Sequence, residues 1–359
     1  MKKKLLYSLF LSLTVLLIIN PQKSVLYAKH GMDLCENIIV PSLFPFFVCS
    51  GLLIYSGFCE VLSKYLQFIM KPLFNVNGSG ASAFVLGIIS GYPLGALTAC
   101  QLYEKNYLSQ SEAERLLAFC NNSGPLFILG AVGISLYHNP KFGVILYCIH
   151  ILSAFLTGLI FRFYKKNDFS APLSAVTVEA NDTSQIFSIV LSNSIQSILT
   201  ICGSVLFFSV LSGIFFDLLP LTENIRAVLT GIFEFTTGIE LLSNTTLPVF
   251  NKLIISAGIV GFAGISVHLQ VMSIVSKYNL SLKPYISGKI TQCTISVFLS
   301  ALILRFTNIN LQTFSKIHAD ISGAYAMNSL FVILTVVSLI FTILAGSIFL
   351  LLKKHYTHN

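Results

Sequence analysis

The sequence contains few charged residues. Only 10% of its 359 residues are Asp, Glu, Lys or Arg, whereas 55% are hydrophobic and the mean hydropathy is +0.81. Such a chain cannot cover a water-facing surface, so a soluble globular protein is excluded. Several charge-free stretches reach the roughly 20 residues that a helix needs to cross a bilayer. They are residues 37–59, 116–140, 142–161 and 321–352, and two longer stretches, 72–103 and 183–216, must tilt, kink or fold back.

The motifs of common metal sites and enzymes are also missing. The eight cysteines and seven histidines are scattered without the short spacings of zinc or redox sites, so we expect no metal and interpret the cysteines as small packing residues. No glycine-rich loop ends in Gly-Lys-Ser or Gly-Lys-Thr, so we expect no ATP hydrolysis. Because no Ser/His/Asp or Cys/His set stands out, we predict that the chain is not an enzyme and has no cofactor.

Basic residues give the chain a net charge of +8, but they gather beside the apolar runs. The clusters are Lys2 to Lys4, Arg162 with Lys165 and Lys166, and Lys353 with Lys354. The positive-inside rule then places both termini in the cytoplasm, with an even number of crossings, and nucleic-acid binding is not expected. The apolar run Leu5 to Ile19 fits a signal peptide ending near Ala28 or an uncleaved first helix, of which we favour the second.

The chain divides into two hydrophobic halves. Residues 1–30 are expected to form an N-terminal transmembrane helix and a polar connection, and residues 307–359 a C-terminal transmembrane helix, at about 330–352, with a basic tail. Between them, the polar linker 166–185 separates residues 31–165 from residues 186–306. The halves resemble a weak repeat, because Gly87-Ile88-Ile89-Ser90 followed by Gly95 is echoed by Gly231-Ile232-Phe233-Glu234 followed by Gly238. A substrate site between the repeats would follow from such a duplication.

Three further elements are expected in the two halves. Ser109 and Glu112 have the spacing of a capping box, which predicts a helix that runs to Cys120. In the second half, we expect a glycine-rich helix over Ile254 to Val275 and another crossing over Pro284 to Leu304.

Two apolar segments contain residues that interrupt helices. Within Ser90 to Gly95, Pro93 removes a backbone donor and the glycines allow close approach, which predicts the tip of a re-entrant hairpin. Packing of small residues between helices is the alternative. Within Asn121 to Pro125, a new helix is predicted to begin, with its free N–H groups and positive dipole end suited to an anion. The alternative there is a tight loop between two ordinary helices.

Charged side chains inside apolar stretches are candidates for a role in transport. A carboxylate at the bilayer centre costs roughly 2.5–3.5 kcal/mol, so Glu234 is predicted to bind a coupling cation or proton, or to orient a donor toward the substrate. An interfacial, water-exposed Glu is the alternative. Arg115 and Arg226 could each bind a carboxylate, although snorkelling to the interface is the commoner fate. His268 could relay protons or simply pack.

The chain resembles a known family at these segments. Ser90-Gly91-Tyr92-Pro93-Leu94-Gly95-Ala96, Glu112 to Arg115, Phe119 to Phe127 and Glu234 to Gly238 resemble segments of the sporulation integral membrane proteins of the YlbJ type, also called stage V sporulation protein VV. The resemblance implies a nucleoside recognition, or Gate, domain related to concentrative nucleoside transporters, and transport of dipicolinic acid. It also implies the mother-cell-derived outer forespore membrane of a spore-forming bacterium.

Together these observations predict an all-α membrane protein, a polytopic helical bundle with two Gate-type repeats containing broken or re-entrant helices. We expect it to be a secondary transporter of a small anionic dicarboxylate. The alternatives are a structural membrane factor of spore assembly and a nucleoside or ion transporter. The predicted substrate-binding residues are Ser90, Gly91, Tyr92, Pro93, Arg115, Asn121, Asn122, Ser123, Gly124, Glu234, Thr236 and Thr237.

Overall fold

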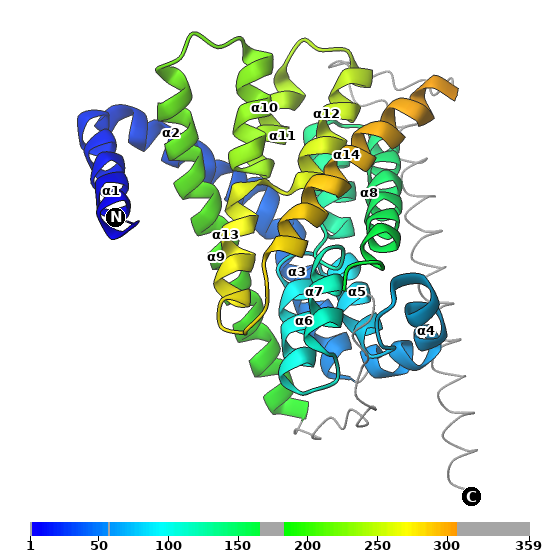
Figure 1. Ribbon diagram of the computed structural model, residues 1–359. Helices are drawn as coiled ribbons and strands as arrows, with labels where there is room; N and C mark the ends of the chain where they lie inside the picture. Colours follow the sequence, from blue (N-terminus) through cyan, green and yellow to red (C-terminus); the bar gives the residue numbers. More distant parts are fainter. Residues whose placement is uncertain (1, 57, 166–182, 307–359) are drawn as a thin grey trace, which may run out of the picture. The chain divides into compact units, whose positions relative to one another are not determined.

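The computed structural model describes residues 2–56, 58–165 and 183–306, and every regular element in these ranges is a helix (Figure 1). The first half contains α1 (Lys2–Ile19), α2 (Pro21–Leu34), η1 (Cys35–Ile39), α3 (Val40–Tyr55), α4 (Phe58–Phe74), α5 (Gly80–Ile89), α6 (Leu94–Glu104), α7 (Gln110–Leu117), η2 (Leu126–Leu136) and α8 (Pro140–Phe161). The second half contains α9 (Thr183–Asp217), α10 (Glu223–Phe233), α11 (Phe235–Asn244), α12 (Val249–Phe262), α13 (Gly264–Val275) and α14 (Lys283–Phe306). The predicted helix at 330–352 and most of the predicted linker lie outside the described residues.

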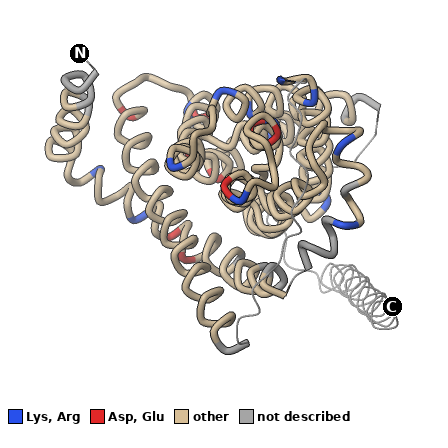
Figure 2. The backbone as a smooth tube through the Cα atoms, turned by 60° about the horizontal axis from the view of Figure 1, so that its bottom comes forward, with Lys and Arg blue, Asp and Glu red and all other residues tan. Residues whose placement is uncertain are grey.

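Four helical segments are long and apolar enough to cross a membrane: Pro140–Phe161, Gln185–Asp217, Val249–Val275 and Lys283–Ile303. A fifth arises if Phe10–Ile19 and Pro21–Ile39, which are bent by 99° at the break between them, at Asn20, form one broken span. Charged residues are sparse along the tube of the chain (Figure 2). The class of polytopic, all-helical membrane protein is therefore confirmed.

The long apolar stretch after residue 72 folds back on itself. Helices α5 and α6 form an antiparallel hairpin whose tip is Ser90 to Pro93, where a hairpin tip was predicted. Two glycines allow the hairpin to pack closely against the segment that follows α7, because a Cβ on Gly87 or Gly95 would overlap the carbonyl oxygen of Cys120. The other long stretch behaves differently, since α9 continues for 35 residues as one helix.

Helices α10 and α11 form a second hairpin, with its tip at Glu234. Here, too, glycines face each other, because a Cβ on Gly238 would overlap the backbone of Gly231. Thus the two segments with echoed sequences take the same form. In Figure 1 the α10–α11 hairpin lies at the top and α5 and α6 lie toward the bottom, so the two hairpins approach the middle from opposite ends.

The prediction of one glycine-rich helix over Ile254 to Val275 was wrong. Ala263 and Gly264 both have a φ of 75°, and this left-handed backbone divides the segment into α12 and α13. The interruption gives room to the second hairpin tip, because a Cβ on Gly264 would lie only 3.1 Å from the backbone nitrogen of Phe235.

The segment between α7 and η2 is interrupted as well. The predicted capping box starts α7: the Ser109 N–H donates to Glu112 Oε2 at 2.9 Å, and the Glu112 N–H donates to Ser109 Oγ at 3.3 Å. However, α7 ends at Leu117, one turn earlier than predicted. Residues 118–124 are not helical, and η2 begins directly after Pro125.

Candidate functional site

The four interruptions meet around a cavity of about 30 Å³. Each contributes lining residues: Ser90, Gly91 and Tyr92 from the first hairpin tip; Ser123 and Gly124 from the α7–η2 break; Glu234, Phe235 and Thr236 from the second hairpin tip; and Ser266 from the start of α13. The rest of the wall comes largely from apolar residues of η1, α3, η2 and α9, with Ser204 and Gln270 as polar exceptions. Segments far apart in the sequence thus line one site.

The two hairpin tips contact each other directly. The rings of Tyr92 and Phe235 lie edge to face, with their centroids 5.3 Å apart, and Phe127 of η2 packs against Phe235 at 4.9 Å. The backbone of Gly91, with a φ of 79°, approaches the α7–η2 break so closely that a Cβ would lie 2.8 Å from the nitrogen of Gly124. The two hairpin tips and the α7–η2 break therefore pack against one another at the cavity.

Four helices begin at the cavity. They are α6 at Leu94, η2 at Leu126, α11 at Phe235 and α13 at Gly264, each one directly after an interruption. The first N–H groups of a helix have no partner within the helix, and the macrodipole places partial positive charge there. Four such ends around one cavity favour negatively charged groups.

Glu234 occupies one of these helix ends. Its side chain, only 1% exposed, accepts a hydrogen bond from the Thr237 N–H at 2.6 Å and so acts as the N-cap of α11. The Thr237 hydroxyl, in turn, lies 2.8 Å from the Ser209 hydroxyl of α9. The helix N-terminus therefore stabilises a buried carboxylate that also lines the cavity.

The α7–η2 break is held by side chains from α8 and α14. The Ser123 N–H donates to Nε2 of His150 in α8 at 3.0 Å, and the Gln292 amide of α14 donates to Asn122 Oδ1 at 2.9 Å. Asn121, also fully buried, faces the hydroxyl of Tyr285 but forms no hydrogen bond of normal geometry within the described residues. The break is thus fixed by buried polar contacts and is not a solvated loop.

Several predicted residues lie away from the cavity wall. Pro93, Asn122 and Thr237 are next in sequence to lining residues, and Asn121 is two residues from Ser123, but none of the four lines the cavity. Arg226 forms an ion pair with Asp217 at the end of α9. His268 Nδ1 lies 2.9 Å from the Tyr285 hydroxyl.

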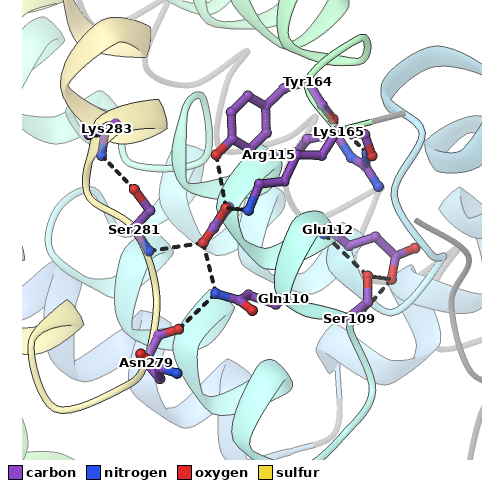
Figure 3. Close-up of polar contacts among 10 residues, drawn as sticks. Ser109, Gln110, Glu112, Arg115, Tyr164, Lys165, Asn279, Ser281 and Lys283 are labelled. Atoms are coloured by element: carbon purple, nitrogen blue, oxygen red, sulfur yellow. Dashed lines mark hydrogen bonds and ion pairs between the residues drawn. The ribbon is translucent and has the colours of Figure 1, made fainter. Parts of the chain in front are cut away.

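Arg115 is buried in a different place. Its guanidinium donates to the carbonyl oxygens of Tyr164 and Lys165 at 2.7 and 2.9 Å, beyond the end of α8 (Figure 3). Carbonyl groups at the C-terminal end of a helix have no hydrogen-bond partner within the helix, and their partial negative charge attracts a cation. The structure therefore places Arg115 outside the cavity, where it binds the end of a neighbouring helix.

Next to Arg115 in the sequence, Glu114 joins three segments of the chain through contacts with Tyr164, Lys165 and Ser281, which are labelled in Figure 3. Its buried carboxylate accepts from the Lys165 ammonium at 2.9 Å, the Tyr164 hydroxyl at 3.0 Å and the Ser281 N–H at 3.0 Å. Burial by itself would raise the pKa of Glu114, but these donors together lower it below the ordinary carboxyl range. This cluster fastens α7 to the end of α8 and to the loop before α14.

Comparison with known proteins relates the chain to one family. The sporulation integral membrane protein YlbJ of Bacillus subtilis (strain 168) is 31% identical over 324 residues, which cover 80% of this chain and 79% of that protein. The chain belongs to the YlbJ family. Residues 38–216 also match the Gate family, described as nucleoside recognition. No solved structure matches.

The Gate match includes the first hairpin and the α7–η2 break of this YlbJ-family protein. Other residues near the cavity were not identified from the sequence. Ser204, Ser266 and Gln270 line it but carry no motif, and His150 reaches the break from α8. A clearer signal was overlooked in the crossing predicted over Pro284 to Leu304, where Lys289 is the only charged residue between Lys283 and Arg305.

Proposed function

We propose that this protein is a transporter that moves a small anionic solute across the membrane through the cavity between its two hairpin tips. The observation that carries the proposal is the meeting of four helix N-termini at one cavity. Interrupted backbone at membrane depth costs several kcal/mol per unpaired group unless it lines a wet cavity or binds a ligand. Discontinuous helices with their N-termini at a central site are how many transporters bind anionic groups.

Dipicolinic acid is the solute we propose. Its dianion is small and planar, with two carboxylates that separate helix N-termini could receive, and the relative that supports the family is named for sporulation. Because Glu234 already neutralises the start of α11, the starts of α6, η2 and α13 remain for the substrate. By the same family relationship, we propose the mother-cell-derived outer forespore membrane as the location, with both termini in the cytoplasm.

In the conformation described here the cavity is too small for this solute. A cavity of about 30 Å³ holds only a few water molecules, so a pyridine dicarboxylate cannot enter before the tips separate. The contact between Tyr92 and Phe235 is the part that must open. Movement of one hairpin at a time would expose the site alternately to the two sides, with energy from a gradient, through a coupling cation or proton near Glu234, or from a partner.

A nucleoside is the rival cargo, because the Gate family is described as nucleoside recognition. A nucleoside is neutral and would not need several helix N-termini. A structural role in the spore membrane is the other alternative, and it predicts no solute flux at all.

Uptake into liposomes separates these functions. Purified protein is reconstituted, and entry of labelled dipicolinate is measured with unlabelled dicarboxylates or nucleosides as competitors. We expect saturable uptake that dicarboxylates inhibit and nucleosides do not. Competition by nucleosides alone would support the rival cargo. Uptake no faster than that of liposomes without the protein would support a structural role.

Glu234→Gln tests the site within the same assay. It keeps the shape of the N-cap but removes its charge, and we expect uptake to fall at least tenfold at every pH tested. Glu223→Gln is the matched control, since it makes the same change at an exposed position of the same hairpin. Equal uptake by the Glu234 variant and the wild type would rule out a role for this carboxylate.

A further inference from the structure

A lysine is buried inside α14 behind the cavity. Lys289 is 0% exposed and lies within the apolar segment Lys283–Ile303. Its ammonium donates to Gln292 Oε1 at 2.9 Å, and among the described residues it forms no ion pair with a carboxylate. A positive charge without a counterion is costly at membrane depth and usually marks a function.

Hydrogen bonds connect this lysine to the α7–η2 break. Gln292 donates from Nε2 to Asn122 Oδ1 at 2.9 Å, and Asn122 donates to the carbonyl of Phe119 at 2.8 Å. Both amide side chains are fully buried. The next residue after Asn122 is Ser123, which lines the cavity, so two buried side chains connect Lys289 to the residue beside the cavity wall.

Helix α14 is held against the break by close backbone contact. A Cβ on Gly288 would overlap the carbonyl oxygen of Ala118, so the residue next to Lys289 touches the unwound segment itself. The titratable groups near the lysine on neighbouring elements are Cys120, His150 and His268, and none is a carboxylate. Among the described residues no counterion therefore cancels the charge that Lys289 carries when its amine is protonated.

In the described part of the chain, the cavity is lined by no basic side chain that would favour an anion. Its lining includes the Glu234 carboxylate but no lysine or arginine among the described residues, and Arg115 and Arg226 are engaged elsewhere. Helix N-termini supply only partial charges.

We propose that Lys289 is the specificity-determining residue that makes the cavity select anions over neutral solutes, by supplying its positive charge from behind the α7–η2 break. The inference rests on the proposed function, because it names the source of charge for the same site. Lys289 does not touch the solute. It acts through the buried Gln292–Asn122 contacts and through space, and its effect grows with each negative charge on the ligand.

Three ligands of one shape and different charge test the proposal. They are pyridine-2,6-dicarboxylate, pyridine-2-carboxylate and pyridine-2,6-dicarboxamide, and their dissociation constants are measured on purified wild type and on Lys289→Met. Methionine is uncharged and similar in size. We expect the constant to rise about tenfold for the monoanion and about a hundredfold for the dianion, and to stay unchanged for the amide.

Two further variants separate charge from packing. Lys252→Met removes another buried lysine, whose ammonium binds the Ser243 carbonyl at 2.7 Å away from the cavity lining, and it should leave all three constants unchanged. Lys289→Arg keeps the charge and should retain the preference for anions. If Lys289→Met does not fold, Lys289→Gln provides the same neutral test.

The possible results are distinguishable. A loss graded by ligand charge supports the proposal. Anion binding that Lys289→Met leaves intact, or that it weakens equally for acid and amide, overturns the role of Lys289 while the proposed function stands. Wild-type protein that prefers the amide to both acids overturns the proposed function and this inference together.

Discussion

At the scale of single residues, two buried carboxylates show how this apolar protein accommodates charge. The carboxylate of Glu234 is stabilised by the start of its own helix, whereas that of Glu114 accepts hydrogen bonds from the end of α8 and from the loop before α14. In both cases N–H or O–H groups replace water. The difference is position: Glu234 borders the cavity, and Glu114 fastens helices together beyond the apolar part of α8.

Glu114 should make the stability of the protein depend on pH. Because its pKa is lowered in the folded state, the unfolded chain binds a proton at higher pH than the folded chain does. The stabilising contribution is therefore present above the ordinary carboxyl range and is lost as pH falls through that range and below it. We expect the thermal unfolding midpoint in detergent to drop between about pH 5 and pH 3.

Glu114→Gln should remove part of this dependence and cost about 2 kcal/mol at neutral pH, because three donors lose a charged acceptor. Glu104→Gln is the control, since Glu104 is exposed at the end of α6. The same pH profile for wild type and the Glu114 variant would contradict this assignment.

Some of these residues could be identified from the sequence and others could not. Glu234 was noticed because a carboxylate in an apolar segment is costly, and the same reasoning applies to Lys289. Arg115 was misplaced because its position at the start of an apolar stretch gives no information on which partner it meets. Its partners are backbone carbonyls about 50 residues later in the chain, which carry no sequence signal.

At the scale of helices, glycine pairs permit the two hairpins. Gly231 and Gly238 bring α10 and α11 into backbone contact, as Gly87 and Gly95 do for α5 and α6 against Cys120. Side chains at these positions would force the helices apart. The hairpins then could not bring both tips to the cavity.

Gly238→Ala should therefore destabilise the protein by about 1–3 kcal/mol and lower solute uptake, because the added methyl group overlaps Gly231. Gly203→Ala is the matched control: a Cβ at Gly203 in α9 meets nothing within 4 Å. Thermal unfolding of the two variants measures the difference. Equal unfolding midpoints for the two variants would contradict the close contact between Gly238 and Gly231.

The interruptions were predicted unevenly for a physical reason. Pro93 and Pro125 mark two of the breaks because proline cannot donate a backbone hydrogen bond. The break at Ala263 and Gly264 contains no proline and no polar residue, so the segment has the composition of an ordinary apolar helix. Only the approach of Phe235 explains its left-handed backbone, and that contact belongs to the tertiary structure.

At the scale of the whole molecule, the arrangement of the breaks matters more than their number. The sequence predicted an apolar helical bundle and two of its interruptions, but composition cannot tell which interruptions meet. The structure brings all four to one cavity, and the two hairpins reach it from opposite ends (Figure 1). The division into two Gate-type repeats remains a prediction, which the matching form of the hairpins supports.

The central claim is that this interrupted backbone surrounds a wet site for an anionic solute. Ser123→Cys, made in a variant without the eight native cysteines, places one thiol at the cavity wall. We expect a small water-soluble thiol reagent to label it in liposomes, and pyridine-2,6-dicarboxylate, but not the matching diamide, to protect it in a saturable manner. A thiol that is never labelled, or one whose labelling the dianion does not change, would contradict the account.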